Sequence, residues 1–355
     1  MQYDFNAQLL LIQSTHRMTM KYDPDISHIY VPNINARIPN ENGGYFIKTN
    51  SSGFRSNFNY LLKKNSKPRV LIFGDSNTAG DGVSNEERFS EIIGETLNSE
   101  SYNYGLSATG PDQQLLLYQK FAKNVENDLV ILFLTVHNIE RIKAKYWQSF
   151  ERTTGKFVWV PKPYFTFKDK GHLKLNHVPV PMVRMENNNE NGKEYIAPFT
   201  DGNKYLDQFN EYSTLRSIIK PITSSLNIGI KKKLSKIKKF QPHPDYDNGN
   251  SKGWKLMEAL IKEFRDKVEP SKLLIVPLPT PNYLLDQINP SFINRFNTLK
   301  TERHINVFDI TSKFMSLDKD EIVKLFFKKD SHYSAYGHYK IAEYVSHYIV
   351  EEKLI

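Results

Sequence analysis

The chemically suggestive residues of this chain follow predicted strands or precede the last predicted helix. Ser76 lies in a Gly-Asp-Ser-Asn turn directly after the β-forming run 69–73, and Asn138 follows the apolar run 128–136. Asp330 and His332 come shortly before the terminal helix. Acyl transfer needs a nucleophile, a base, a group that orients the base, and donors for the oxyanion. Since open α/β folds place their ligands at the carboxyl edge of the sheet, these residues could supply all four.

In this reading, Ser76 is the nucleophile and His332 is the base that takes its proton. Asp330 accepts from the other ring nitrogen of His332, and the Asn138 amide donates to the developing negative charge. The alternative for the first motif is plain, because Gly-Asp-Ser-Asn is also a common turn with a helix cap.

The composition excludes other chemistries. Cysteine is absent, which rules out disulfides, zinc–thiolate sites and a cysteine nucleophile. No His and carboxylate cluster has metal-ligand spacing, and His243-Pro-Asp245 is isolated in a predicted loop. We therefore expect neither a metal nor a cofactor.

The elements that would position these residues alternate between strand and helix. Buried β-forming runs predict strands at 69–73, 101–106, 128–136, 272–278 and 305–310. Amphipathic runs predict helices at 86–97, 113–124, 254–268, 291–299 and 335–349. Such alternation indicates a parallel sheet covered on both faces, a three-layer α/β/α domain. The last helix is expected to pack Tyr339, Ala342, Val345 and Ile349, with His338 at the surface or at a cap.

Changes in pattern divide the chain into four parts. Residues 1–66, rich in Asn, Tyr and Pro, predict an N-terminal arm that lies over the domain. The first part of the domain is then expected at 67–146 and the second at 251–355. The irregular stretch 147–250 predicts an insertion that forms a lid or side lobe. Its Trp147 and Trp159 could stack on sugar rings or form the small core of that lobe.

The charge of the chain is concentrated in one segment. The net charge is +9, but it would be only +3 without the six lysines of Lys231–Lys239. This segment could contact an anionic membrane or an acidic glycan, or simply be a solvated face; it does not indicate a nucleic-acid-binding surface. No run reaches the roughly 18 apolar residues of a membrane span, and no signal-peptide pattern is present. The expected location is the cytoplasm, with peripheral contact at the inner membrane surface as a variant.

The motifs together resemble those of the SGNH hydrolase superfamily, also called the GDSL family. Gly74-Asp75-Ser76 matches its first block, and 103–110, Asn-Tyr-Gly-Leu-Ser-Ala-Thr-Gly, loosely matches its second. Of the third block, Val136-His137-Asn138-Ile139 keeps only the Asn. Asp330-Ser331-His332 has the short spacing found in the branch that acts on bacterial polysaccharides.

This resemblance implies a flavodoxin-like fold with a five-stranded parallel sheet. It implies an oxyanion hole formed by the N–H groups of Ser76 and Ala108 with the Asn138 amide. Gly105 is the alternative to Ala108 if the register is shifted. Asp75, Gly105 and His137 are the further residues expected near the substrate.

The expected activity is removal of an O-acetyl group from a carbohydrate through an acyl-Ser76 intermediate. An O-acetyltransferase that modifies a bacterial surface glycan would use the same residues, and so would a lipid esterase. From a different class, the chain could be a non-catalytic module that binds glycan or anionic membrane through its basic segment.

Overall fold

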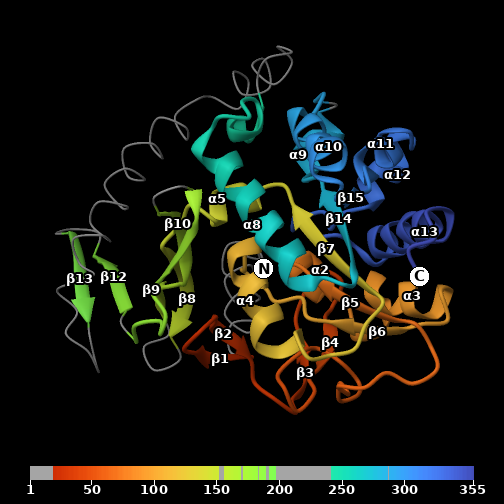
Figure 1. Cartoon of the computed structure of the whole chain (residues 1–355). Coiled ribbons are helices and arrows are strands. Elements are labelled where there is room, and N and C mark those ends of the chain that lie inside the picture. Colours follow the sequence, from red (N-terminus) through yellow and green to blue (C-terminus); the bar gives the residue numbers. More distant parts are fainter. Residues whose placement is uncertain are drawn as a thin grey trace.

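The computed structural model describes residues 19–151, 156–168, 171–182, 184–188, 192–196, 241–286 and 288–355. The basic segment Lys231–Lys239 lies outside the described residues, so the expectation attached to it stays a prediction. Figure 1 shows the chain as a central sheet between two layers of helices, with strands of the insertion on one side.

The central sheet has five parallel strands in the order β15-β14-β7-β5-β6. Their bounds are Arg69–Phe73 (β5), Glu100–Asn103 (β6), Leu129–Thr135 (β7), Lys272–Leu278 (β14) and Asn306–Val307 (β15). All seven residues of β7 are buried, as its unbroken apolar run predicts for a central strand covered on both faces. The predicted five-stranded parallel sheet is confirmed, although β15 is shorter than the predicted strand 305–310.

Helices cover both faces of the sheet. One apolar cluster joins alternate strand residues such as Phe73 and Leu132 to the first set of helices, and a second joins Ile72 and Phe133 to the other set. The first set is α4 (Pro111–Leu117), α8 (Lys252–Val268) and α10 (Ser291–Arg303). The second set is α3 (Phe89–Thr96), α11 (Ile310–Met315) and α13 (Ala335–Glu351). This is the predicted three-layer arrangement.

Shorter helical elements complete the domain. They are α2 (Ser76–Ala79), α5 (Asn138–Arg141), α9 (Pro281–Leu285), α12 (Lys319–Lys324), the 3-10 turns Asn85–Glu87 and Pro244–Tyr246, and the π turn Tyr118–Ala122. Three of them follow strands directly at the carboxyl edge of the sheet: α2 after β5, α5 after β7 and α9 after β14. Ser76 begins α2 and Asn138 begins α5, whereas Asp330 and His332 lie between α12 and α13.

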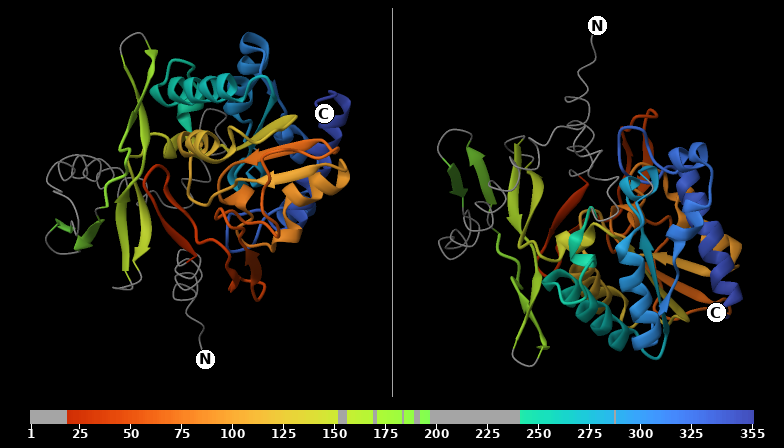
Figure 2. Two further views of the ribbon diagram at one scale, coloured as in Figure 1. Left: turned by 60° about the horizontal axis from the view of Figure 1, so that its bottom comes forward. Right: turned by 90° about the horizontal axis from the view of Figure 1, so that it is seen from above.

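The described part of the N-terminal arm forms two antiparallel hairpins. The first pairs β1 (Met20–Asp23) with β2 (Ser27–Tyr30), and the second pairs β3 (Asn35–Ile38) with β4 (Tyr45–Lys48). Figure 2 shows both hairpins packed beside the domain.

The described part of the insertion consists of antiparallel strands. A four-stranded sheet has the order β13-β12-β9-β8, and β10 pairs with β11. Their bounds are Tyr146–Glu151 (β8), Lys156–Pro161 (β9), Tyr164–Phe167 (β10), Leu173–Asn176 (β11), Arg184–Asn188 (β12) and Gly192–Ile196 (β13). A buried ion pair between Lys162 and Asp112 of α4 ties the insertion to the domain. Trp147 stacks on His28 of the arm, with ring centroids 4.0 Å apart, so it packs between segments.

Two expectations for the last helix are wrong. His338 is fully buried, and its Nδ1 accepts from the backbone N–H of Phe89 at 3.2 Å. Tyr339, expected in the core, is 51% exposed. Ala342, Val345 and Ile349 are buried as predicted. The buried face formed by Ala342, Val345 and Ile349 therefore continues to His338 instead of Tyr339, because a histidine with a backbone partner on α3 can replace an apolar residue in the interior.

In the described ranges, no helix is long and apolar enough to cross a bilayer.

Candidate active site

Ser76 lies where β5 passes into α2, in a turn that the surrounding atoms determine closely. A Cβ at Gly74 would lie 1.9 Å from Thr78 Oγ1 and 2.9 Å from the Phe133 carbonyl oxygen, so only glycine fits there. Asp75 caps α2 by accepting from the Asn77 N–H at 3.0 Å, and Gly80 ends the helix with φ of +82°. The turn presents Ser76 at the carboxyl edge of the sheet.

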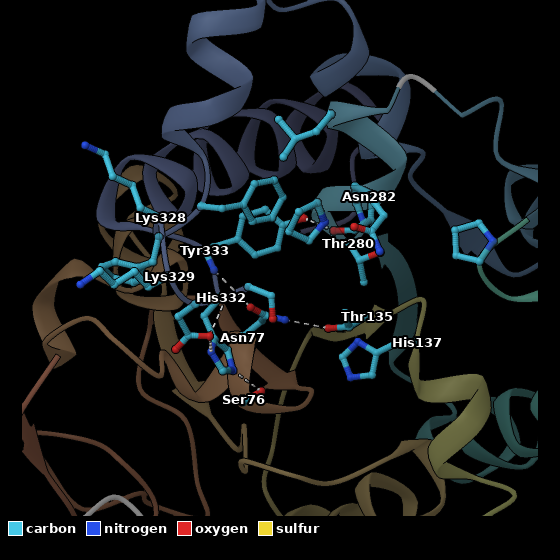
Figure 3. Close-up of a pocket in the computed structure, with 18 of the residues that line it drawn as sticks. Ser76, Asn77, Thr135, His137, Thr280, Asn282, Lys328, Lys329, His332 and Tyr333 are labelled. Atoms are coloured by element: carbon cyan, nitrogen blue, oxygen red, sulfur yellow. Dashed lines mark hydrogen bonds and ion pairs between the residues drawn. The ribbon is translucent and has the colours of Figure 1, made fainter. Parts of the chain in front are cut away.

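Three predicted residues are brought together across the fold. His332 Nε2 is 2.8 Å from Ser76 Oγ, and His332 Nδ1 is 2.7 Å from Asp330 Oδ1 (Figure 3). Because the carboxylate can only accept, Nδ1 carries the proton in the neutral imidazole and Nε2 is free to accept from the serine hydroxyl. Ser76 and His332 are 256 positions apart in the sequence, so folding alone creates this contact.

The environment of His332 favours its protonated form. Burial lowers the pKa of the imidazole, but the hydrogen bond and charge of Asp330, with Asp81 and Asp75, raise it to about 9. In the same pair, burial raises the pKa of Asp330, and its interaction with His332 lowers it below the usual value. A carboxylate that stabilises an imidazolium is what proton transfer from a serine hydroxyl requires.

Asp75, expected near the substrate, has a structural role instead. Its side chain is fully buried and accepts from Asn77 N–H and Thr135 Oγ1 at 3.0 Å and from an Arg141 N–H at 3.3 Å. The carboxylate therefore joins the Ser76 turn to β7 and α5, and it is not among the residues that line the cavity.

Gly105 and Ala108, the two candidates for a backbone N–H donor to the oxyanion, differ in their backbone contacts and conformation. The Gly105 N–H already donates to Asn103 Oδ1 at 2.7 Å, and a Cβ at Gly105 would lie 2.5 Å from Ala79 N. Gly105 is thus committed to close packing against α2. Ala108 has φ of +63°, the left-handed region that favours glycine. Ala108 thus holds a backbone conformation that alanine seldom adopts.

Asn138 begins α5 and is fully buried. Among the described residues, neither its amide nitrogen nor its side-chain oxygen has a hydrogen-bond partner. Buried amides are normally satisfied, so an unpartnered amide at this position is unusual. Of the three predicted oxyanion donors, Ser76 lines the cavity, whereas Ala108 and Asn138 are not among the lining residues.

A cavity of about 820 Å³ opens above Ser76 and His332. Its polar lining includes His137 and Arg141 at the two ends of α5, and Thr280 and Asn282 at the start of α9. Its apolar lining includes Pro279, Pro281, Leu285, Phe326 and Phe327. Figure 3 shows His137 across the cavity from His332, while Lys328 and Lys329 point away from it.

His137 lines the cavity as an uncharged ring. Burial and the positive charge of Arg141 lower its pKa to about 3, partly offset by Asp75, whose Oδ2 is 3.9 Å from His137 Nε2. A neutral imidazole can both donate and accept a hydrogen bond. Its position in the cavity agrees with the expectation that it lies near the substrate.

Sequence reasoning missed Arg141. It lies one helical turn after Asn138, a spacing that could have indicated it. Its guanidinium donates to the Thr109 carbonyl oxygen at 2.8 Å and to Asp75, which connects the loop of Ala108 to the turn of Ser76.

His243, named above with Asp245 in connection with metal binding, also lines the cavity. The carboxylate of Asp245 forms an ion pair with Lys143 at 2.6 Å. In the part of the chain that the structure describes, no three His, Asp or Glu side chains gather so that they could hold a metal ion.

The strand order 2-1-3-4-5 is that of a flavodoxin-like, doubly wound α/β fold, which is the fold that the resemblance implies. The Ser motif follows the first strand of this sheet, and the Asp and His motifs precede the last helix.

Solved structures similar to this chain include three from bacteria. A member of the lipolytic G-D-S-L family from Veillonella parvula is 13% identical, with a TM-score of 0.39 over 78% of this chain and 94% of that one. A lipase/acylhydrolase from Enterococcus faecalis is 10% identical, with a TM-score of 0.38 over 79% and 95%. An acetyl xylan esterase from Butyrivibrio proteoclasticus is 10% identical, with a TM-score of 0.35 over 87% and 66%. No family model and no curated protein sequence matches the chain.

Proposed function

We propose that this protein is a serine-dependent enzyme of acyl-ester chemistry, with Ser76 as nucleophile, His332 as general base and Asp330 as its orienting group. The observation that carries the proposal is the continuous hydrogen-bonded chain Ser76–His332–Asp330 at the wall of an open cavity. A surface turn with a helix cap would have no reason to meet a histidine–carboxylate pair from the other end of the domain.

In the proposed reaction, Ser76 Oγ attacks the ester carbonyl carbon and its proton passes to His332 Nε2. The tetrahedral intermediate collapses, and His332 gives this proton to the departing alkoxide oxygen, which leaves an acyl-Ser76. Water then attacks the acyl carbon with His332 again as base, and the acid and free Ser76 are released. Asp330 holds the Nδ1 proton throughout.

The oxyanion is assigned to the N–H groups of Ser76 and Ala108 and to the Asn138 amide. The glycine-like backbone of Ala108 and the unsatisfied amide of Asn138 support this assignment. Each such donor contributes about 3 kcal/mol to transition-state stabilisation in comparable sites.

For the substrate, we propose an O-acylated carbohydrate from which an acetyl group is removed. Hydrogen-bonding side chains along one wall of the cavity, among them His137, Thr280 and Asn282, suit sugar hydroxyls. A cavity of about 820 Å³ also has room for an acceptor sugar in place of water. This favours an O-acetyltransferase of a surface glycan as the second candidate, with the same acyl-Ser76.

The test is hydrolysis of p-nitrophenyl acetate, with and without acetylated glycans and free acceptor sugars. Ser76→Ala should lower kcat/KM by about 10⁴-fold or more, and a fluorophosphonate should label the wild type at Ser76. Ser316→Ala, an exposed serine at the end of α11, is the matched control and should keep full activity. Faster release with an acceptor sugar indicates the transferase. Unchanged activity in Ser76→Ala would overturn the proposal and leave the non-catalytic binding module.

A further inference from the structure

The N-terminal arm contacts each of the three loops that carry proposed site residues. It does so through polar side chains that reach mostly backbone atoms, at points far apart in the sequence. These loops are the turn after α2, the Ser107–Ala108 loop and the loop Phe327–His332.

At the Ser107–Ala108 loop, two side chains of β2 reach the residue before Ala108. His28 Nε2 lies 2.8 Å from the Ser107 carbonyl oxygen, and the Tyr30 hydroxyl lies 2.8 Å from Ser107 Oγ. A donor N–H at Ala108 is useful only if the peptide keeps its direction, so these contacts hold the loop that would carry it.

At the turn after α2, the fully buried Arg55 donates to two carbonyl oxygens. Its guanidinium reaches Gly80 at 2.7 Å and Val83 at 2.8 Å. The arm thereby holds the chain just after Ser76.

At the loop Phe327–His332, the contact comes from one carboxylate. Glu41, in the turn between β3 and β4, accepts from the backbone N–H groups of both Lys328 and Lys329, each at 2.7 Å. The turn is itself ordered, because Asn40 Oδ1 accepts from the N–H groups of Asn42 and Gly44. Asn40 Nδ2 also donates to the Gly82 carbonyl oxygen at 2.8 Å, so the turn is tied to the domain.

The loop needs such a support. It is closed at its base by the Phe327 N–H donating to the His332 carbonyl oxygen at 3.1 Å and by a bridge between Phe326 and Tyr333. Its tip carries Asp330, whose side chain is 40% exposed. Carboxylates bind two neighbouring amide N–H groups through short, charge-assisted hydrogen bonds, and these two N–H groups are the ones that immediately precede Asp330.

We propose that Glu41 is a positioning residue for the acyl-transfer site: by holding the Lys328 and Lys329 amides, it sets where Asp330 and His332 lie relative to Ser76. This inference rests on the proposed function. The role is geometric, since Glu41 contacts the backbone of the loop and neither His332 nor Ser76. The N-terminal arm is on this view part of the active-site framework.

The test compares Glu41→Ala and Glu41→Gln with Asn42→Ala, an exposed side chain in the same turn, in the full chain with p-nitrophenyl acetate. Glu41→Ala should lower kcat by about 10- to 100-fold, the scale of a displacement of about 1 Å, with KM within about twofold. Glu41→Gln keeps an oxygen acceptor for one N–H and should fall between Glu41→Ala and wild type. Asn42→Ala should equal wild type.

Two further measurements separate positioning from general damage. Labelling by a fluorophosphonate should slow in parallel with kcat in Glu41→Ala, while the melting temperature stays close to that of Asn42→Ala. The ascending limb of the pH profile should move to lower pH, because a looser Asp330 supports the imidazolium less.

The role of Glu41 would be overturned if Glu41→Ala kept the wild-type kcat and pH limb. If Ser76→Ala were inactive in the same experiment, the proposed function would remain intact. Full activity in Ser76→Ala would instead remove the proposed function. If Glu41→Ala does not fold, Glu41→Gln decides: a normal kcat and pH limb in a folded Glu41→Gln would also count against the proposal.

Discussion

The two halves of the candidate site are held in different ways. The Ser76 turn is buried: Asp75 is inaccessible and accepts hydrogen bonds from α2, β7 and α5, and Gly74 leaves no room for a side chain. The Asp330–His332 loop lies nearer the surface, with side chains 40% and 24% exposed. It depends on a few polar contacts, those of Glu41 among them.

This difference predicts whether a substitution in each half should change stability, activity or both. A change in the buried half removes packing and leaves a charge without its partner, so it should act on stability as well as on activity. A change in the exposed half should act on activity while the fold persists.

Asp330→Asn should lower kcat/KM by about 10²- to 10⁴-fold, because the amide no longer stabilises the imidazolium or fixes the tautomer. Its cost in unfolding free energy should stay below about 1 kcal/mol, since the carboxylate is partly in water. Ester hydrolysis and urea unfolding measure the two. Asp266→Asn, at an exposed position on α8, is the control and should change neither. If Asp330→Asn lost as much unfolding free energy as transition-state stabilisation, the two halves of the site would not differ in this way.

Asp75→Ala should lower the free energy of unfolding by about 3 kcal/mol, because it removes the cap of α2 and leaves Arg141 without its carboxylate. Burial lowers the pKa of Arg141, and the negative charge of Asp75 partly offsets this lowering. Urea unfolding measures the change, with Asp266→Ala as control. A variant as stable as wild type would show that the Ser76 turn is no more rigid than the loop opposite.

The pH dependence of kcat/KM should report the protonation of His332, which lies in the exposed half of the site. Only neutral His332 can accept the Ser76 proton, so kcat/KM should rise with pH and level off above about 9. The same raised pKa stabilises the fold: this contribution is fully present below the ordinary histidine pKa of about 6.5 and is lost as pH rises through about 9. In Asp330→Asn the activity limb should fall toward about 6.5. If the activity limb of the wild type already lay near the ordinary histidine pKa, the His332–Asp330 pair would be looser than its 2.7 Å contact indicates.

Much of the fold could be predicted because its signals are local. The apolar run of β7, the turn after β5 and the stripes of α8 and α13 are patterns within a few residues, and the parallel sheet covered on both faces follows from strand and helix alternation. The order of the strands in that sheet was not predicted. The insertion lacks such periodicity, and its antiparallel strands were not predicted.

For the candidate site, the sequence by itself determined the residue types at the strand ends: Ser76 in its turn, Asn138 after β7, and Asp330 and His332 before α13. The tertiary structure alone decided which of them meet and what surrounds them. Asp75 became a buried support, Gly105 a packing residue and His338 part of the interior, while Arg141 and Glu41 gained partners across the fold. The reason is that burial and hydrogen-bond partners arise between segments distant in the chain, and neither spacing nor periodicity records which segments those are.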